Sequence, residues 1–170
     1  MNFTLLAGLW LGLLQMQGTS LPFRFEFANH DGKPVMIISN AEEKITCDEI
    51  TLQGDSIFIT LPLYNSEFRL KAEREKLSGN WINRSRKTPV VIPFTAMRGS
   101  FSRFPVTKRE AYPQYPAGRW ETWFDAGTPD SSLAIGIFKE KNGEVTGTFL
   151  TESGDHRYLE GIMDGDSLKL

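Results

Sequence analysis

Apolar and polar side chains alternate along much of this chain with the period of a β-strand. The clearest case is Phe23-Arg24-Phe25-Glu26-Phe27, in which three aromatic residues alternate with two charged ones. Such alternation places successive side chains on opposite faces, as in a strand with one face on a core and the other in water. No stretch has a convincing amphipathic helical period. The pattern predicts an all-β protein.

Short apolar runs separated by turn residues, such as Asp31-Gly32 and Gly54-Asp55, define the expected strands. In the first hundred residues we expect strands at 8–17, 21–29, 34–39, 44–53, 56–62, 66–72, 78–83 and 90–97. Strands joined by such short turns pair as antiparallel neighbours, and a meander of about eight strands can remove its open edges by closing. An up-and-down barrel follows, with either a filled interior or room for one small ligand.

Three landmarks recur about 110 residues further along, which indicates an internal duplication. They are Gly8-Leu9-Trp10 with Gly118-Arg119-Trp120, Asp31-Gly32 with Asn142-Gly143, and Gly54-Asp55-Ser56 with Gly165-Asp166-Ser167. In the second copy we expect strands at 118–124, 133–139, 145–151, 157–163 and from 167 onward. Leu170 corresponds to Ile59, so the fold class predicted is two tandem antiparallel meander barrels, the second truncated.

The expected domain limits follow from the duplication and from a proline-rich stretch. We predict a first barrel at residues 1–103, a linker at 104–117 and a second barrel, incomplete at its C-terminus, at 118–170. Proline fixes its own backbone and disfavours helix in the residue before it, so the linker is expected to be semi-extended. Because a barrel without its last strands keeps open edges, we expect the chain alone to aggregate or dimerise through the second copy.

Composition and charge limit the classes of function that this chain can have. The chain has 40% apolar and 24% charged residues and a net charge of −2, which gives no general attraction to nucleic acid or anionic membranes. The apolar run at residues 3–11 has no preceding Lys or Arg and is too short to span a bilayer. Since Trp10 in this run recurs as Trp120, we assign the residues from about Gly8 onward to the first strand and expect no membrane span.

Few residues suggest catalysis. Cys47 is the only cysteine, which excludes an internal disulfide or a C-x-x-C pair, and we interpret it as a core residue rather than a reactive thiol. His30 and His156 lack the spacing of a metal site, and no phosphate-binding loop, serine elbow or zinc motif is found. The sequence therefore predicts no enzyme activity in this chain, no catalytic residue, no cofactor and no metal.

The four tryptophans are the candidate site residues: Trp10, Trp81, Trp120 and Trp123. A Gly-x-Trp motif begins each copy, and Trp81 lies in a similar motif, Gly79-Asn80-Trp81. One interpretation is that each indole closes the bottom of a barrel, with glycine allowing the backbone to bend. The other is an aromatic wall around a small apolar ligand. Trp123 replaces Leu13 of the first copy, which suggests a surface or an interface.

Several segments resemble the N-terminal, non-catalytic region of TlpA-like thiol-disulfide oxidoreductases from Bacteroidetes-type bacteria. They are residues 118–121 (GRWE), 134–139 (AIGIFK), 145–161 (VTGTFLTESGDHRYLEG), 21–26 (LPFRFE) and 81–83 (WIN). The resemblance implies a thioredoxin-like domain downstream in cis, export to the periplasm or cell envelope, and a signal upstream of Met1. The Gly-x-Trp opening is also similar to calycin-type barrels such as lipocalins and avidins.

Three functions are compatible with these observations. The first is an accessory module that positions or recognises a protein client for a thiol-disulfide oxidoreductase whose redox domain lies beyond residue 170. The second is a calycin-like carrier of a small apolar ligand. The third is a purely structural or dimerisation module.

Overall fold

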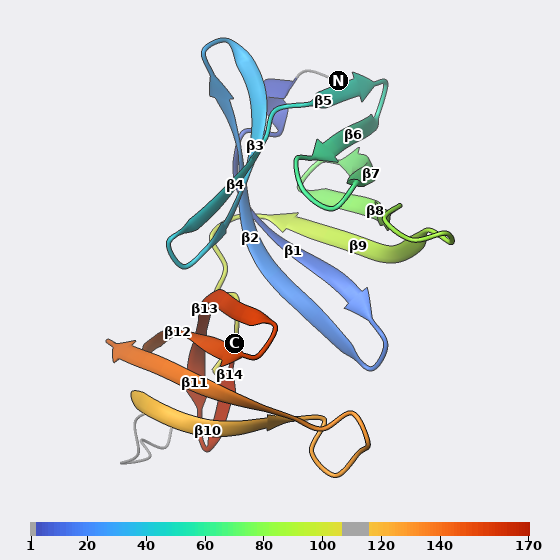
Figure 1. Ribbon diagram of the computed structural model, residues 1–170. Coiled ribbons are helices and arrows are strands. Elements are labelled where there is room, and N and C mark those ends of the chain that lie inside the picture. The colour runs from blue at the N-terminus through green and yellow to red at the C-terminus, as the bar shows by residue number, and fades with distance from the viewer. Residues whose placement is uncertain (1–2, 107–115) are drawn as a thin grey trace. The chain divides into compact units, whose positions relative to one another are not determined.

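The computed structural model describes residues 3–106 and 116–170, and it confirms the predicted all-β class (Figure 1). Apart from one 3-10 turn, η1 (Phe3–Leu5), every element within these described residues is a strand. The chain divides into two compact units, Met1–Ser39 with Lys44–Arg103 and Asn40–Glu43 with Phe104–Leu170. None of the described residues form a helix long and apolar enough to cross a membrane. Most of the expected linker at 104–117 lies outside the described residues, and the domain limits drawn from the sequence remain predictions.

The first unit is a nearly closed, antiparallel barrel-like sheet of nine strands, in the order β4-β3-β2-β1-β9-β8-β7-β6-β5. The strands are β1 (Gly8–Met16), β2 (Thr19–His30), β3 (Lys33–Asn40), β4 (Glu43–Cys47), β5 (Ile50–Gln53), β6 (Ser56–Leu61), β7 (Ser66–Glu73), β8 (Lys76–Asn83) and β9 (Val90–Arg98). The last strand returns to pair with the first, as a closed meander requires, and the sheet ends lie at β4 and β5.

The expected strand at 44–53 was wrong as a single element, because it is broken into β4 and β5 at Asp48 and Glu49. The amide of Ile50 donates to the carbonyl of Asp48 at 3.2 Å, so the backbone turns here. The apolar alternation changes phase at the same place, since Ile45 and Cys47 are separated from Ile50 by an extra residue. The barrel therefore has one strand more than the sequence pattern predicted.

Aromatic rings fill the centre of the first unit. Phe25 stacks on Trp10 at 6.2 Å and meets Phe27 edge to face at 5.5 Å, while Phe68 and Phe94 lie 4.9 Å apart. All five side chains are buried. Burying a side chain of this size contributes roughly 2 to 3 kcal/mol, so this cluster is a major source of stability.

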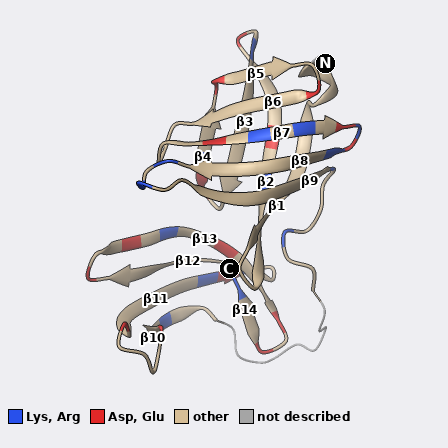
Figure 2. Cartoon of the chain, turned by 90° about the vertical axis from the view of Figure 1, so that its right-hand side faces the viewer, with Lys and Arg blue, Asp and Glu red and all other residues tan. Residues whose placement is uncertain are grey.

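The outward positions of the same strands carry charge. Figure 2 shows basic and acidic residues along β7, which has the burial pattern of a strand with one wet face. Glu67 on this strand accepts hydrogen bonds from Arg69 and Arg84, each at 2.7 Å. The alternation predicted from the sequence is thus realised with one face on the aromatic core and one in solvent.

The second unit is a five-stranded antiparallel sheet that forms a half-barrel, in the order β10-β11-β12-β13-β14. The strands are β10 (Gly118–Phe124), β11 (Ser132–Lys141), β12 (Glu144–Thr151), β13 (Gly154–Asp164) and β14 (Ser167–Lys169). They match the expected segments within a few residues. The predicted second, incomplete barrel is confirmed.

The duplication is visible in the backbone angles of matched residues. Gly8 and Gly118 have φ of 120° and 123°, and each is the first residue of the strand that carries the first tryptophan of its copy. The matched turns have φ of 52° and 81° at Asp31 and Gly32, and 56° and 84° at Asn142 and Gly143. Positive φ at both central residues is typical of the two-residue hairpin turn that favours Asn-Gly and Asp-Gly.

The two copies differ where β4 breaks from β5. The corresponding strand of the second unit, β13, is continuous but contains an irregularity opposite Gly147 and Phe149. Tyr158, which corresponds to Cys47, has a φ of 63° in this irregular stretch. A bulge bends a strand without ending it, so the second copy has one continuous strand where the first copy has two.

Candidate functional site

Two of the four candidate tryptophans belong to the packed interior of the first unit. Trp10 is 1% exposed, and its indole nitrogen donates to the carbonyl oxygen of Leu6 at 2.8 Å. Trp81, on β8, is partly buried and packs against the same core. The Trp10 ring packs against both Phe25 and Phe27, so it fills the barrel rather than lining a ligand cavity.

The other two tryptophans, Trp120 and Trp123, are exposed on β10. Trp120 makes the same bond as Trp10, from its indole nitrogen to the carbonyl oxygen of Pro116 at 2.8 Å, but its side chain is 46% exposed. Trp123 is 53% exposed, in agreement with the expected surface position. Trp120 therefore keeps the local geometry of a barrel plug without a closed core around it in the described part of the chain.

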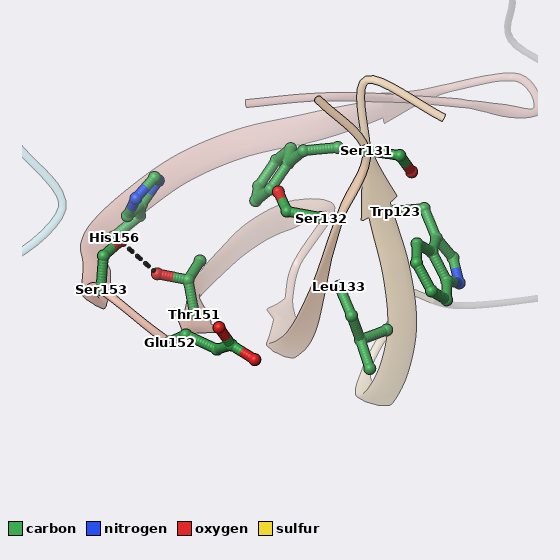
Figure 3. Close-up of a pocket in the computed structure, with 9 residues that line it drawn as sticks. Trp123, Ser131, Ser132, Leu133, Thr151, Glu152, Ser153 and His156 are labelled. Carbon is green, nitrogen blue, oxygen red and sulfur yellow. Dashed lines mark hydrogen bonds between the residues drawn. The ribbon is translucent and has the colours of Figure 1, made fainter. Parts of the chain in front are cut away.

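A cavity of about 530 Å³ lies at the end of the second sheet that contains Trp123 (Figure 3). It is bounded by the end of β10, the start of β11 and the β12–β13 hairpin. We call it the Trp123 groove. Its lining residues are Trp123, Phe124, Ser131, Ser132, Leu133, Thr151, Glu152, Ser153 and His156.

Aromatic rings form the apolar part of the groove. Phe124 stacks on the imidazole of His156 with ring centroids 5.9 Å apart, and it meets Phe149 edge to face at 5.1 Å. Trp123 and Leu133 are directly opposite each other on β10 and β11. Because both side chains are well exposed, they present apolar surface to any molecule that enters.

Hydroxyl groups hold the β12–β13 hairpin that forms the opposite wall. The hydroxyl of Thr151 donates to the carbonyl oxygen of Gly154 at 2.7 Å and lies 3.1 Å from the hydroxyl of Ser153. The hydroxyl of Thr148 donates to the carbonyl oxygen of His156 at 3.1 Å. These bonds fix the backbone that carries Glu152 and His156 into the lining.

The lining contains one carboxylate, Glu152, and no Lys or Arg. The indole nitrogen of Trp123 is engaged by the carboxylate of Glu121 at 3.2 Å, which leaves the ring faces for contact. A groove with exposed rings, hydroxyls and one negative group suits a neutral or cationic ligand with an apolar face. It does not suit phosphate, which needs cationic or convergent amide donors.

Sequence reasoning identified Trp123 but missed Phe124 and His156 as its neighbours. The rings meet because β12 and β13 fold back on each other as a hairpin, which brings His156 opposite Phe149 in the ladder. The phase of the alternation could have indicated this pairing, since Phe149 and His156 flank the turn at Glu152-Ser153.

Cys47 lies at the end of β4 and is fully buried. Burial, and secondarily the charge of Asp48, raise the pKa of this thiol to about 11. Since the thiolate is the nucleophile, the thiol is unreactive at neutral pH. Within residues 3–106 and 116–170, no group of three or more His, Cys, Asp or Glu is placed to hold a metal.

Comparisons with protein-family models, with curated proteins and with solved structures gave no match for this chain.

Proposed function

We propose that this chain is a non-catalytic binding module that recognises a partner through the Trp123 groove of its second unit. The observation that carries the proposal is the asymmetry between the copies. The first copy encloses its aromatic residues in a filled barrel, whereas the second exposes Trp123 and Leu133, which are directly opposite each other on β10 and β11. Adjacent large apolar side chains on a surface mark interaction sites.

The chemistry of the described residues supports binding rather than catalysis. The only thiol is buried and protonated at neutral pH. In the groove, the hydroxyl of Thr151 is bound to a backbone carbonyl, and the imidazole of His156 lies flat against Phe124. This arrangement does not pair a nucleophile with a base, which covalent catalysis requires.

The resemblance to TlpA-like proteins suggests a setting for this module. We propose that it serves a thioredoxin-like domain carried in cis, in the periplasm or cell envelope, by holding a protein client close to the redox centre. Tethering of this kind raises the effective concentration of a client without chemistry by the barrel itself. In the parent protein, deleting the module would lower activity on protein clients more than on a small disulfide, and equal losses would contradict this role.

Client binding can be tested on the chain itself. A reduced and carboxymethylated polypeptide, which stays unfolded, would be titrated while tryptophan fluorescence is followed. We expect Trp123→Ala to weaken binding about tenfold, a loss of roughly 1.4 kcal/mol. Trp120→Ala is the matched control, because Trp120 lies on the same strand with similar exposure but does not line the groove. Absence of binding, or equal losses in both variants, would contradict the proposal.

The volume of the groove favours a second candidate, a carrier of a small apolar ligand. A cavity of about 530 Å³ lies within the usual range for small-molecule pockets, about 300 to 1,000 Å³. An apolar fluorescent dye distinguishes the two candidates. Saturable dye binding that is lost in Trp123→Ala, together with no response to the unfolded polypeptide, would favour the small ligand.

A further inference from the structure

The hairpin turn between β11 and β12 consists of Asn142 and Gly143. Both residues are exposed. Asn142 is the only asparagine of the sequence that is followed by glycine. Because glycine has no side chain to shield its own amide nitrogen, this nitrogen can approach the carboxamide of the preceding residue more easily than in any other asparagine pair of the chain.

Such an approach leads to deamidation, a reaction that makes asparagine one of the chemically labile residues. The nitrogen of Gly143 loses its proton to hydroxide and attacks Cγ of Asn142. The N–Cγ bond forms, the Cγ–Nδ2 bond breaks, and ammonia leaves with a proton from water. A second water molecule then opens the five-membered imide at either carbonyl carbon, which gives aspartate or isoaspartate. Water enters, ammonia leaves, and no group is oxidised or reduced.

The proton that this reaction must remove is held by a carboxylate in the folded chain. The amide of Gly143 donates to Oε1 of Glu140 at 2.6 Å. Glu140 is half-buried near the end of β11 and lies opposite Val145 in the ladder. Val145 is fully buried, so the pairing that positions Glu140 beside the turn is anchored in the core of the second unit.

A carboxylate in this position slows the first step for two reasons. Its hydrogen bond stabilises the neutral N–H of Gly143, and its negative charge repels the amide anion that has to form. A carboxylate is also too weak a base to remove the proton of a backbone amide itself. Glu140 therefore protects Asn142 rather than activating its neighbour.

We propose that Asn142 is a site of spontaneous deamidation, and that Glu140 sets the rate of the reaction in the folded chain by holding the amide proton of Gly143. Water is the only reagent, so the modification requires neither a partner nor an enzyme. This inference goes beyond the proposed function, because none of these three residues lines the Trp123 groove.

The two products are expected to affect the hairpin differently. The first copy has Asp31 in the place of Asn142, with a φ of 52° against 56°, so this turn accepts aspartate. Isoaspartate instead adds a Cβ atom to the main chain between the paired residues Lys141 and Glu144. Because the register decides which face each side chain takes, we expect isoaspartate to loosen this end of the hairpin and aspartate to leave it intact.

Peptide mass spectrometry after incubation of the whole chain at pH 8 tests the site. We expect Asn142 to gain the mass of deamidation before every other asparagine, each of which is followed by a residue with a side chain. Glu140→Ala should raise the rate at Asn142 at least about threefold, and Glu140→Gln, which removes only the charge, should raise it less. Earlier conversion of another asparagine, or no faster reaction in Glu140→Ala, would overturn the inference.

Glu144→Gln is the matched control, because it removes a carboxylate from the other side of the same turn, whereas the amide of Gly143 donates to Glu140. We expect its rate to stay within about twofold of the unchanged chain. In concentrated urea, which breaks the hydrogen bond, the unchanged chain and Glu140→Ala should react equally fast. Equal acceleration by Glu144→Gln, or a difference that persists in urea, would overturn the role of Glu140.

Hydrogen exchange keeps the role of Glu140 testable if Glu140→Ala loosens the hairpin. Base-catalysed exchange of an amide passes through the same nitrogen anion, so it measures the first step alone. By nuclear magnetic resonance, we expect the Gly143 amide to exchange at least about twofold faster in Glu140→Gln than in the unchanged chain. The amide of Val145, which is paired on both sides, should keep its protection. Unchanged exchange at Gly143, or equal acceleration at both amides, would overturn the role of Glu140.

Discussion

Trp10 and Trp120 lie 110 residues apart and donate the same hydrogen bond, from the indole nitrogen to a carbonyl oxygen four residues earlier, at 2.8 Å in both cases. In each copy the bond spans a glycine with a φ near 120°. The local structure of this opening is therefore independent of what surrounds the indole, which is buried in one copy and half exposed in the other.

This difference predicts unequal effects of the same substitution. Trp10→Ala removes a fully packed ring, and we expect it to lower the free energy of unfolding by about 3 to 5 kcal/mol. Trp120→Ala removes a ring that already contacts water, and we expect a loss of about 1 kcal/mol. Urea denaturation followed by circular dichroism measures both. Equal losses would show that Trp120 is buried in solution.

The Cys47 thiol is predicted to report unfolding. A thiol reagent at pH 7.5 should label the folded chain at least a hundredfold more slowly than the urea-unfolded chain, because the thiol is buried and its pKa is about 11. Rapid labelling without denaturant would contradict the buried position.

The same thiol predicts a loss of stability in alkali. Its folded pKa, about 11, lies above the value of 9.0 for the thiol in the unfolded chain. A raised pKa means that the stabilisation is complete below pH 9 and is lost as the pH rises toward 11. Cys47→Ala is the control, because a variant without a thiol should lose less of its stability over this window than the unchanged chain.

The ion pairs of Glu67 are expected to give the opposite pH dependence, with stability lost in acid rather than in alkali. Burial alone would raise its pKa, but hydrogen bonds and charges of Arg84 and Arg69 outweigh burial and lower it. A lowered pKa gives stability that is present above the unfolded value, 4.5, and is lost as the pH falls through the folded value. Glu67→Gln should cost about 0.5 to 1 kcal/mol at pH 7, because all three side chains are partly solvated. The difference in unfolding free energy should vanish in acid, and a constant difference would point to lost packing instead.

We expect an added side chain at Gly79 to destabilise the fold strongly, because the backbone of the neighbouring strand lies close to it. Its φ is 153°, and an added Cβ would lie 2.1 Å from the carbonyl oxygen of Arg69 on the neighbouring strand. Gly79→Ala should therefore cost about 3 kcal/mol or more, since the clash is with backbone and cannot be relieved by a rotamer change. Gly18→Ala is the matched control, with a φ of 75° and open space around the added Cβ. It should cost about 1 kcal/mol, and similar thermal midpoints for the two variants would contradict the close approach.

The sequence predicted the strands where the alternation was regular, because a period of two identifies a half-buried strand directly. Phe23 to Phe27 shows this in β2, where Phe25 and Phe27 are buried and Glu26 between them is exposed. The prediction of 44–53 as one strand failed because a change of phase was overlooked between Cys47 and Ile50. That signal is present in the sequence, so the ninth strand was recoverable.

The candidate site was less accessible to sequence reasoning. Trp123 stood out because it has no counterpart in the first copy, and the structure places it on the surface as expected. The Trp123 groove depends on the stacking of Phe124 on His156. His156 lies on a hairpin about thirty residues further along the chain. The pairing of His156 with Phe149 follows from the hairpin turn, but the stack on Phe124 depends on the curvature of the sheet, which cannot be derived from alternation alone.

The burial of Cys47 has a practical consequence for experiments in solution. Because the native thiol does not react at neutral pH, a second cysteine introduced at an exposed position can be labelled selectively in the otherwise unaltered chain. One spin label or fluorophore on β10 would then report on that strand alone. Because its native cysteine is buried in the core, the chain is suited to spectroscopy with a label at a single chosen site.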